Sequence, residues 1–403
     1  MAKQWHTLII GGGASGLAAA VFCARKVGGE RVVLLEKAPR VGKKLLATGN
    51  GTCNITNRRA DASRYHGADV SFTVPALQAF SPKACIDFFE SLGVMCSSHE
   101  EGREYPLCGQ AAAVLDCLRL ELKALGVTER CDAAVTAIRP EKSGFSVVAA
   151  DETLYAKHVI LATGGAAAPA LGGSAEGYNL ATALGHKKTP LFPSIVQVKT
   201  DTTFIKAMKG LRTDATVKFV LDGKPLCDRT DELLFTEYGI SGPAVMHISR
   251  VVGDWERRKN GTMEVVIDLL PSLSEERLVA QLAARPARTA EDFLTGLLHK
   301  RIGQTVCRAA GLSLGDTVTD HRRLAVTIKH FTVKVIGTQG FGGAQVTAGG
   351  IDTRDIDPHT MQSRLVPHLY LIGELLDVDG DCGGYNLQWA WASAYAAART
   401  VSQ

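Results

Sequence analysis

Three glycines near the start of the chain have the spacing of a phosphate-binding turn. Gly11, Gly13 and Gly16 match the pattern G-x-G-x-x-G. A short apolar run, residues 7–10, precedes them, and a longer one, residues 17–25, follows. In a strand–turn–helix unit the first glycine makes the turn, the second lets the backbone approach a pyrophosphate, and the third lets helix and strand pack closely. The free N–H groups of the helix start attract the phosphates. To this predicted pyrophosphate site we assign Gly11, Gly13, Ala14, Ser15 and Gly16.

An acidic residue stands where a second strand of this unit would end. Residues 31–35 predict that strand, and Glu36 follows it. It lies about twenty residues after the last glycine, where a carboxylate accepts hydrogen bonds from ribose hydroxyls. We therefore predict that the chain binds a dinucleotide, with Glu36 on the ribose.

The segment after Glu36, residues 37–57, is too basic and glycine-rich for a core element. Its lysines follow a ribose-binding strand, so we assign Lys37 and Lys44 to the cofactor site. The alternative is a solvated basic surface loop.

A second helix start lies near the end of the chain. Residues 369–372 predict a buried strand that is followed by Gly373 and Glu374, and a glycine-rich loop then opens an alanine-rich helix. Two such helix starts on one sheet suit FAD better than NAD, because the second can face the flavin edge on which negative charge develops during reduction. We predict Gly373 and Glu374 near the ribityl and phosphate portion of FAD.

At the start of that helix, Gly384 exposes the backbone before the first turn. We expect the backbone N–H groups of Asn386 and Leu387 to reach the N1–C2=O edge of the flavin. All three residues are assigned to the cofactor site.

Two further segments complete the predicted site. The strand predicted at residues 157–165 runs into the small residues Thr163 and Gly164, which leave room for a cofactor. Before it, residues 131–138, 144–150 and 153–155 predict a small antiparallel meander, in which we assign Val135 to the site.

These alternating strands and helices predict an α/β chain. We expect a Rossmann-like FAD-binding domain that is interrupted by an inserted β-rich domain with a helical subdomain. The FAD-binding domain is predicted over residues 1–189 and 345–403, the insertion over 190–344 and its helical subdomain over about 271–330. Within the insertion, strands are predicted at 194–199, 215–221, 233–236, 263–269 and 331–336, and helices at 274–284, 290–298, 302–310 and 320–330.

Composition sets the broad class. Of the 403 residues, 46% are hydrophobic and 21% charged, which supports large cores and argues against global disorder. A net charge of +4 is too mild to indicate a nucleic-acid or anionic-membrane partner. The sequence shows no membrane-spanning run and no separate signal region. Its ten cysteines form no C-x-x-C pair, so we expect no metal site and a reducing, cytoplasmic location.

No catalytic constellation stands out in the sequence. Cys53 has no partner thiol four or five residues on, so we expect it to pack beside the flavin rather than act as a redox thiol. Tyr238 and Ser241 fit either a substrate cleft or a turn between domains. His247 and His330 lie in apolar patterns and are expected to be structural.

The chain resembles the YhiN/BaiN-like family of bacterial FAD-dependent oxidoreductases. The resemblance rests on four stretches: IIGGGASGLAAA, GKKLLATGNGTCNITN, TEYGISGPAVMHIS, and residues 349–394. It implies the interrupted FAD-binding fold described above, a reduced nicotinamide donor, and a small substrate, which in some relatives is the carbon–carbon double bond of an oxidised bile acid. One position departs from the family pattern G-R-C-N, because Thr52 replaces the arginine.

The predicted function is that of a soluble FAD oxidoreductase that transfers hydride between NAD(P)H and a small organic substrate. Two alternatives stay open at this point. One is an RNA-modifying flavoprotein, for which Lys206, Lys209 and Arg212 would begin a basic patch. The other is a flavin-binding sensor without turnover.

Overall fold

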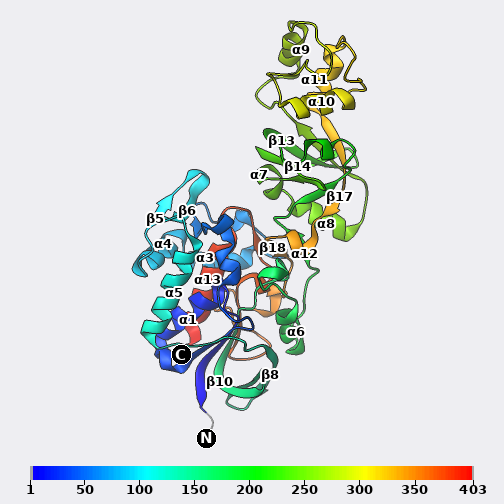
Figure 1. Cartoon of the computed structure of the whole chain (residues 1–403). Helices are drawn as coiled ribbons and strands as arrows, with labels where there is room; N and C mark the ends of the chain where they lie inside the picture. The colour runs from blue at the N-terminus through cyan, green and yellow to red at the C-terminus, as the bar shows by residue number, and fades with distance from the viewer. Residues whose placement is uncertain (1–2, 402–403) are drawn as a thin grey trace. The chain divides into compact units, whose positions relative to one another are not determined.

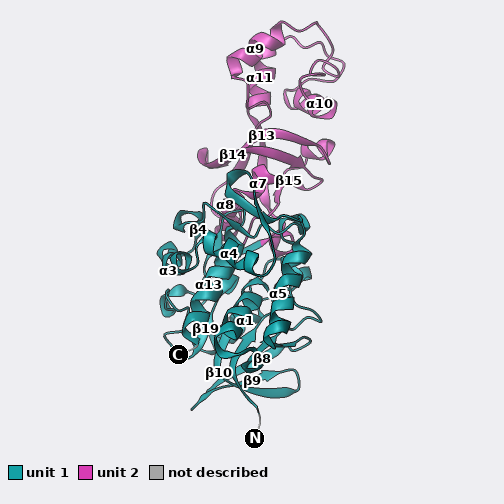
Figure 2. Cartoon of the chain, turned by 90° about the vertical axis from the view of Figure 1, so that its left-hand side faces the viewer, with its two compact units in different colours: residues 1–191, 346–403 teal, residues 192–345 magenta. Residues whose placement is uncertain are grey.

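The computed structural model describes residues 3–401 and divides the chain into two compact units (Figure 2). Unit 2 consists of residues 192–345, and unit 1 of the described residues before and after it. Each unit has its own hydrophobic core. The predicted fold class, a Rossmann-like domain interrupted by a β-rich insertion with a helical subdomain, is confirmed.

A seven-stranded sheet forms the centre of unit 1 within residues 3–401 (Figure 1). Its order is β7-β2-β1-β10-β9-β8, with β19 beside the carboxyl half of β10. The strands around β1 pair in parallel, whereas β8, β9 and the first half of β10 form an antiparallel meander. β2 and the last three residues of β1 are buried and apolar, as is usual for parallel strands that are covered on both faces. The bounds are β1 Gln4–Ile10, β2 Val32–Leu35, β7 Thr128–Arg130, β8 Val135–Glu141, β9 Gly144–Ala149, β10 Glu152–Leu161 and β19 Leu369–Leu371.

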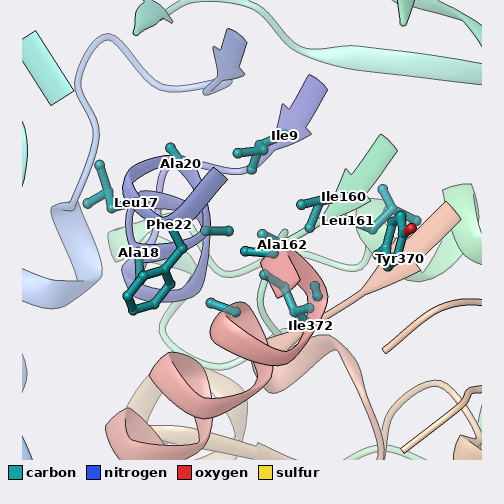
Figure 3. Packing of buried hydrophobic residues seen from close by; sticks show 14 of the residues in the cluster. Ile9, Leu17, Ala18, Ala20, Phe22, Ile160, Leu161, Ala162, Tyr370 and Ile372 are labelled. Carbon is teal, nitrogen blue, oxygen red and sulfur yellow. The ribbon is translucent and has the colours of Figure 1, made fainter. Parts of the chain in front are cut away.

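Two alanine-rich helices pack beside this sheet. Helix α1 (Ala14–Val27) contacts both α13 (Tyr385–Val401) and α5 (Ala111–Leu125). Small side chains such as Ala18 and Ala20 let α1 come close to its neighbours, and Figure 3 shows them on the same helix as Leu17 and Phe22. The other helices of unit 1 are α2 Lys43–Leu46, α3 Val74–Ala79, α4 Pro82–Ser91 and α6 Glu176–Ala183.

Short ladders surround the sheet of unit 1. Strands β3, β6 and β5 form one of them, and β4 pairs with β20 in another. The second ladder joins residues more than 300 positions apart, so it ties the loop before α13 to the first part of the chain. The bounds are β3 Thr56–Asn57, β4 Tyr65–His66, β5 Cys96–Ser98, β6 Arg103–Pro106, β18 Val346–Ala348 and β20 Asp379–Gly380.

Unit 2 is built on a closed antiparallel barrel. Its order is β12-β15-β14-β13-β16-β17, and the pairing of β12 with β17 closes it. Buried and exposed residues alternate along β17, because inward side chains fill the barrel and outward ones meet solvent. The bounds are β11 Phe192–Ser194, β12 Val198–Thr200, β13 Arg212–Leu221, β14 Lys224–Phe235, β15 Gly239–Ser241, β16 Met263–Asp268 and β17 Phe331–Thr338, with helices α7 Pro243–Met246, α8 Arg250–Arg258 and α12 Gly340–Gly343.

The helical subdomain is inserted between β16 and β17 (Figure 1). It holds α9 (Glu275–Ala283), α10 (Lys300–Ala309) and α11 (His321–Lys329). Ser274 and Asp320 cap α9 and α11 by accepting backbone hydrogen bonds at 3.3 and 2.9 Å, as helix-start residues of these types do.

Residues 290–298, predicted as a helix, form turns instead. The N–H groups of Ala290 and Glu291 donate to the carbonyls of Asp316 and Leu314, at 2.8 and 3.0 Å. These hydrogen bonds tie the segment to residues 314–316.

Two strands are longer than predicted. β10 is one continuous strand that serves both the meander and the parallel sheet. β14 begins at Lys224, nine residues before the predicted strand at 233–236. The part of β14 before residue 233 is held by β13 through the Thr216–Thr230 hydroxyl pair at 2.7 Å and the Arg212–Glu232 ion pair. Among the helices of residues 3–401, none combines the length and apolar character needed to cross a bilayer.

Candidate functional site

The turn between β1 and α1 excludes side chains at two of its three glycines. A Cβ on Gly11 would lie 2.4 Å from the Ala162 carbonyl oxygen, and one on Gly16 would lie 1.8 Å from that of Gly11. Around Gly13, by contrast, a Cβ would meet nothing within 4 Å. Gly13 is also the N-cap of α1, so no side chain satisfies the first N–H groups of the helix. This open, uncapped helix start is suited to a phosphate.

Glu36 fixes the shape of that turn. Its Oε2 accepts from the Gly12 N–H at 2.7 Å and its Oε1 from the Ala38 N–H at 2.8 Å. A carboxylate offers about four acceptor positions, so capacity remains for ribose hydroxyls. Val135, at the start of β8, lies two residues beyond Ala133, whose N–H donates to the Glu36 carbonyl at 2.9 Å. The structure thus places Val135 at the Glu36 end of the site.

The two predicted lysines are both held by carboxylates. Lys37 Nζ lies 2.7 Å from Glu176 Oε2, at an exposed position. Lys44 Nζ lies 2.7 Å from Glu374 Oε2, and the other Glu374 oxygen accepts from the Thr347 N–H at 2.8 Å. Lys44 and Glu374 are far apart in the sequence, and the structure brings them together.

The ends of β10 and β19 meet the start of α1. A Cβ on Gly373 would lie 2.7 Å from Ser15 Oγ, so β19 ends directly against the predicted phosphate turn. After β10, Gly164 has a φ of +70° and open space where a side chain would be. Beside it, Thr163 Oγ1 is buried without a hydrogen-bond partner among the described residues. Such an orphaned hydroxyl is unfavourable and fits a site in which a bound group completes the hydrogen bond.

At the start of α13, Gly384 packs closely against the loop at residues 54–56. A Cβ on Gly384 would lie 2.7 Å from the Thr56 carbonyl oxygen and 2.8 Å from Asn54 Oδ1. Asn54 Oδ1 is itself buried with no partner among the described residues. The sequence analysis missed Asn54 and Thr56, although the asparagine-rich run NGTCNITN was a signal of a tightly turned loop.

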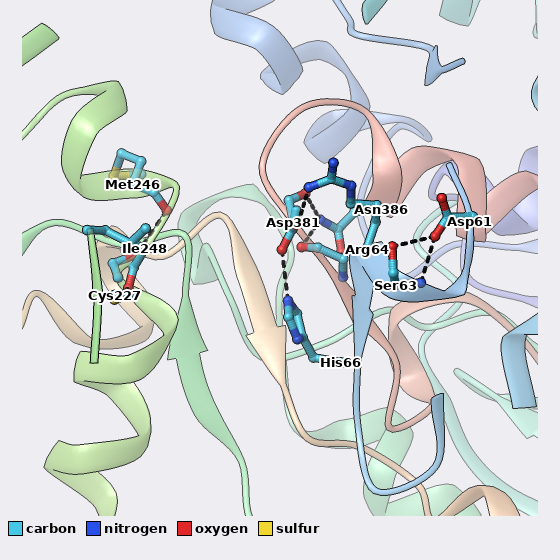
Figure 4. Close-up of polar contacts among 11 residues, drawn as sticks. Asp61, Ser63, Arg64, His66, Cys227, Met246, Ile248, Asp381 and Asn386 are labelled. Atoms are coloured by element: carbon cyan, nitrogen blue, oxygen red, sulfur yellow. Dashed lines mark hydrogen bonds and ion pairs between the residues drawn. The ribbon is translucent and has the colours of Figure 1, made fainter. Parts of the chain in front are cut away.

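The Asn386 side chain clamps the loop that leads into α13. Its Oδ1 accepts from the Gly380 N–H at 2.8 Å, and its Nδ2 donates to the Gly380 and Asp381 carbonyls at 2.8 and 3.2 Å (Figure 4). Only the backbone N–H of Asn386 is left for a ligand. Leu387, the next residue of α13, is partly buried beside it.

Cys53 is unsuited to redox chemistry. Its side chain is fully buried, and burial raises the pKa of its thiol to about 12. A thiol with so high a pKa forms little thiolate at neutral pH and is a poor nucleophile. Within residues 3–401 no group of three or more His, Cys, Asp and Glu side chains is arranged to hold a metal ion.

The candidates in unit 2 lie in its barrel and helical subdomain. Ser241 is a buried residue of β15, and Tyr238 lies in the turn before it, with its carbonyl accepting from the Thr200 N–H at 3.1 Å. His330, which was expected to be structural, lies at an exposed position. Its side chain is 59% exposed, and its Nε2 lies 3.6 Å from Glu275 Oε2.

A family model described as the HI0933-like protein Rossmann domain matches residues 5–400. The chain belongs to this family. It is 39% identical to a 3-dehydro-bile acid delta(4,6)-reductase of Clostridium scindens over 98% of both chains. It is also 32% identical to a ribosomal RNA dihydrouridine synthase of Escherichia coli, over 99% of this chain and 98% of that one.

Solved structures share the fold at low sequence identity. A 3-ketosteroid-delta4-(5alpha)-dehydrogenase of Rhodococcus jostii aligns with a TM-score of 0.52 and 15% identity, over 100% of this chain and 98% of that one. The FrdA chain of Escherichia coli quinol fumarate reductase aligns with a TM-score of 0.50 and 18% identity, over 100% of this chain and 70% of that one. Together with the family match, these findings identify a flavoprotein of oxidoreductase type with a Rossmann-like FAD-binding fold.

Proposed function

We propose that this protein is an FAD-dependent reductase that uses NAD(P)H to reduce a carbon–carbon double bond conjugated to a carbonyl group in a small organic substrate. The observation that carries the cofactor assignment is the turn at Gly13, where an uncapped helix start, the Glu36 carboxylate and the end of β19 meet. That combination of an anion site and a ribose acceptor is suited to a dinucleotide.

Different residues of unit 1 bind different parts of FAD. The N–H groups at the start of α1 bind the pyrophosphate, Glu36 binds ribose hydroxyls, and Thr163 offers its orphaned hydroxyl. The backbone N–H groups of Asn386 and Leu387, at the start of α13, are the donors for the flavin edge that becomes negative on reduction. When bound, FAD supplies two-electron hydride chemistry.

Two relatives with different substrates support the class of bond. The bile acid enzyme is named for a 3-dehydro substrate, which carries a ketone, and for double bonds conjugated to it. The other is named for making dihydrouridine, which requires saturating a uracil double bond that is conjugated to a carbonyl. In a double bond conjugated to a carbonyl, the carbon remote from the carbonyl is electrophilic and can accept hydride, and the carbon nearer to it can then take a proton. We therefore assign this shared chemistry to the present chain.

The experiment tests the cofactor assignment and the substrate class separately. Purified protein is expected to be yellow and to release FAD on denaturation. In anaerobic rapid mixing, NADH or NADPH should bleach the flavin, and a conjugated enone such as a 4-en-3-oxosteroid should then restore its colour and gain two hydrogens. Colourless protein that reconstitutes with NAD but not with FAD would refute the cofactor. Reduced flavin that no conjugated enone reoxidises would refute the substrate class.

RNA is the second candidate substrate. Two relatives, from Escherichia coli and Haemophilus influenzae, are named ribosomal RNA dihydrouridine synthases and align over 98% or more of both chains at 32% and 31% identity. In addition, the net charge of +4 comes entirely from residues 192–345, and the rest of the chain is balanced. We rank this candidate second because its relatives are less similar than the bile acid enzyme. Retention of ribosomal RNA with a steep dependence on salt, together with dihydrouridine in that RNA, would reverse the order.

A further inference from the structure

A histidine–aspartate pair lies at the loop that leads into α13. His66 ends β4, which pairs with β20 in the register Asp379–His66 and Gly380–Tyr65. This ladder brings His66 to Asp381, with Nε2 2.8 Å from Oδ1 (Figure 4). A carboxylate can only accept, so the neutral ring donates from Nε2.

Asp381 is held in place from several sides. Its N–H donates to the Arg64 carbonyl at 2.9 Å, and its own carbonyl accepts from Asn386 Nδ2 at 3.2 Å. The Arg64 guanidinium lies 3.6 Å from the second carboxylate oxygen, Oδ2. The adjacent Tyr65 hydroxyl donates to the Tyr385 carbonyl in the first turn of α13, at 3.0 Å. The pair is thus tied to the helix start that we assign to the flavin.

The other ring nitrogen of His66 is left available. Within the described part of the chain, Nδ1 makes no hydrogen bond, and the side chain is 36% exposed. The charged groups around the pair include Arg64, which lies two positions before His66, and Asp379 across the ladder. Asp377 is a third, and it accepts from the Ala68 N–H at 3.2 Å. An imidazole that is oriented at one nitrogen and open at the other has the arrangement of a general acid.

Other acids close to this loop are less suited to that role. Tyr65 is buried, its hydroxyl already donates, and burial raises its pKa well above the usual value. The Cys53 thiol is buried and has a pKa of about 12. Histidine, in contrast, exchanges its proton in the neutral pH range.

We propose that His66 is the proton donor of the reduction and that Asp381 is its positioning residue, an inference that rests on the proposed function. A hydride, with its two electrons, adds to the β-carbon, and the π electrons of the double bond move toward the carbonyl to leave an enolate. The Nδ1–H bond of the His66 imidazolium then breaks, and a C–H bond forms at the α-carbon. The imidazole regains its proton from water. FAD, held by the residues assigned above, would supply the hydride and its two electrons, and NAD(P)H would be the reductant that restores them.

The experiment follows the two half-reactions separately in the FAD-loaded, full-length protein. For His66→Gln, reoxidation of the reduced flavin by the enone should slow about 10²- to 10⁴-fold, the usual range for a lost general acid. Its reduction by NAD(P)H should stay within about twofold of the parent, because that step needs no proton donor to carbon. Asp381→Asn should slow only the enone step, by about tenfold, because it loosens the orientation of the ring. His359→Gln, at an exposed histidine elsewhere in unit 1, is the matched control and should change neither step.

Two readouts do not depend on folding of the variants. In ¹⁵N-histidine spectra of the parent apoprotein, the neutral His66 ring should carry its proton on Nε2. With the parent enzyme in D₂O, deuterium should enter the product at the α-carbon.

The outcomes distinguish a failure of the role given to His66 from a failure of the proposed function on which that role rests. If the pair only ties β4 to β20, the rate of the enone step in His66→Gln should stay within about threefold of the parent rate. That result would overturn the inference but not the proposed function. A parent ring protonated on Nδ1 would also overturn it. If no enone reoxidises the reduced flavin of the parent protein, both the proposed function and the inference are overturned.

Discussion

The cofactor assignment is tested most directly at Glu36, because a single carboxylate holds two backbone donors of the phosphate turn. Glu36→Gln keeps the shape of the side chain and removes its charge. The amide has one acceptor oxygen, so its NH₂ group must face either the Gly12 N–H or the Ala38 N–H, which the carboxylate now accepts at 2.7 and 2.8 Å. The turn at Gly13 then relaxes in the free protein and must be restored when FAD binds.

The size of the effect follows from these two hydrogen bonds. A hydrogen bond to a charged group contributes about 1.5–3 kcal/mol, and the substitution loses one of the two. Since 1.4 kcal/mol corresponds to a factor of ten, we expect FAD to bind about 10- to 150-fold more weakly. The loss of contacts to the ribose would add to this value.

The assay is titration of apoprotein with FAD, followed by the quenching of flavin fluorescence. Glu176→Gln is the matched control, because Glu176 also pairs with a predicted cofactor lysine, Lys37, but its side chain is 66% exposed. Exposed pairs contribute about 0–1 kcal/mol, so the control should lose less than about fivefold in affinity. Urea unfolding of both apoproteins checks that the fold is retained. A dissociation constant for Glu36→Gln within about twofold of the parent would refute the role given to this residue.

Three further predictions concern the pH dependence, the thiols and the insertion. His158 is 2% exposed with neither ring nitrogen bonded among the described residues, and burial lowers its pKa from 6.5 to about 3. Below pH 6.5 the His158 ring is protonated in the unfolded chain but stays neutral in the folded chain. Unit 1 should therefore lose about 2 kcal/mol of unfolding free energy between pH 6.5 and 5. His158→Phe should remove this loss in urea titrations, and an equal loss in both proteins would contradict the assignment. In native protein, iodoacetamide should label exposed Cys108 much faster than buried Cys53, and equal labelling by mass spectrometry would be inconsistent with the burial of Cys53. Residues 192–345 expressed alone should fold, because they have their own core and the Gln345 N–H bonds to the Ile195 carbonyl at 3.1 Å near the two ends; an amide NMR spectrum without dispersion would count against it.

Local sequence patterns were enough to predict those strands and helices that are buried along most of their length. The glycine turn, the strand before it and the helix after it depend on contacts within some twenty residues, and the structure has β1 and α1 where the pattern places them. The caps Ser274 and Asp320 were predicted for the same reason, since a cap bonds to a residue three positions away. The interruption of the fold was visible as a change from strand–helix alternation to strand-rich sequence.

Only the tertiary structure decided which distant residues meet. The part of β14 before residue 233 is a strand because β13 supplies its partners, and the N–H groups of residues 290 and 291 bond to carbonyls at 316 and 314. Likewise, Lys44 reaches Glu374 and His66 reaches Asp381 across more than 300 positions. Local sequence determines the preference of a segment for helix, strand or turn. It does not specify which distant residue completes a hydrogen bond or an ion pair. The sequence therefore predicted a cofactor turn at Gly13, and the fold decided which side chains stand beside that turn.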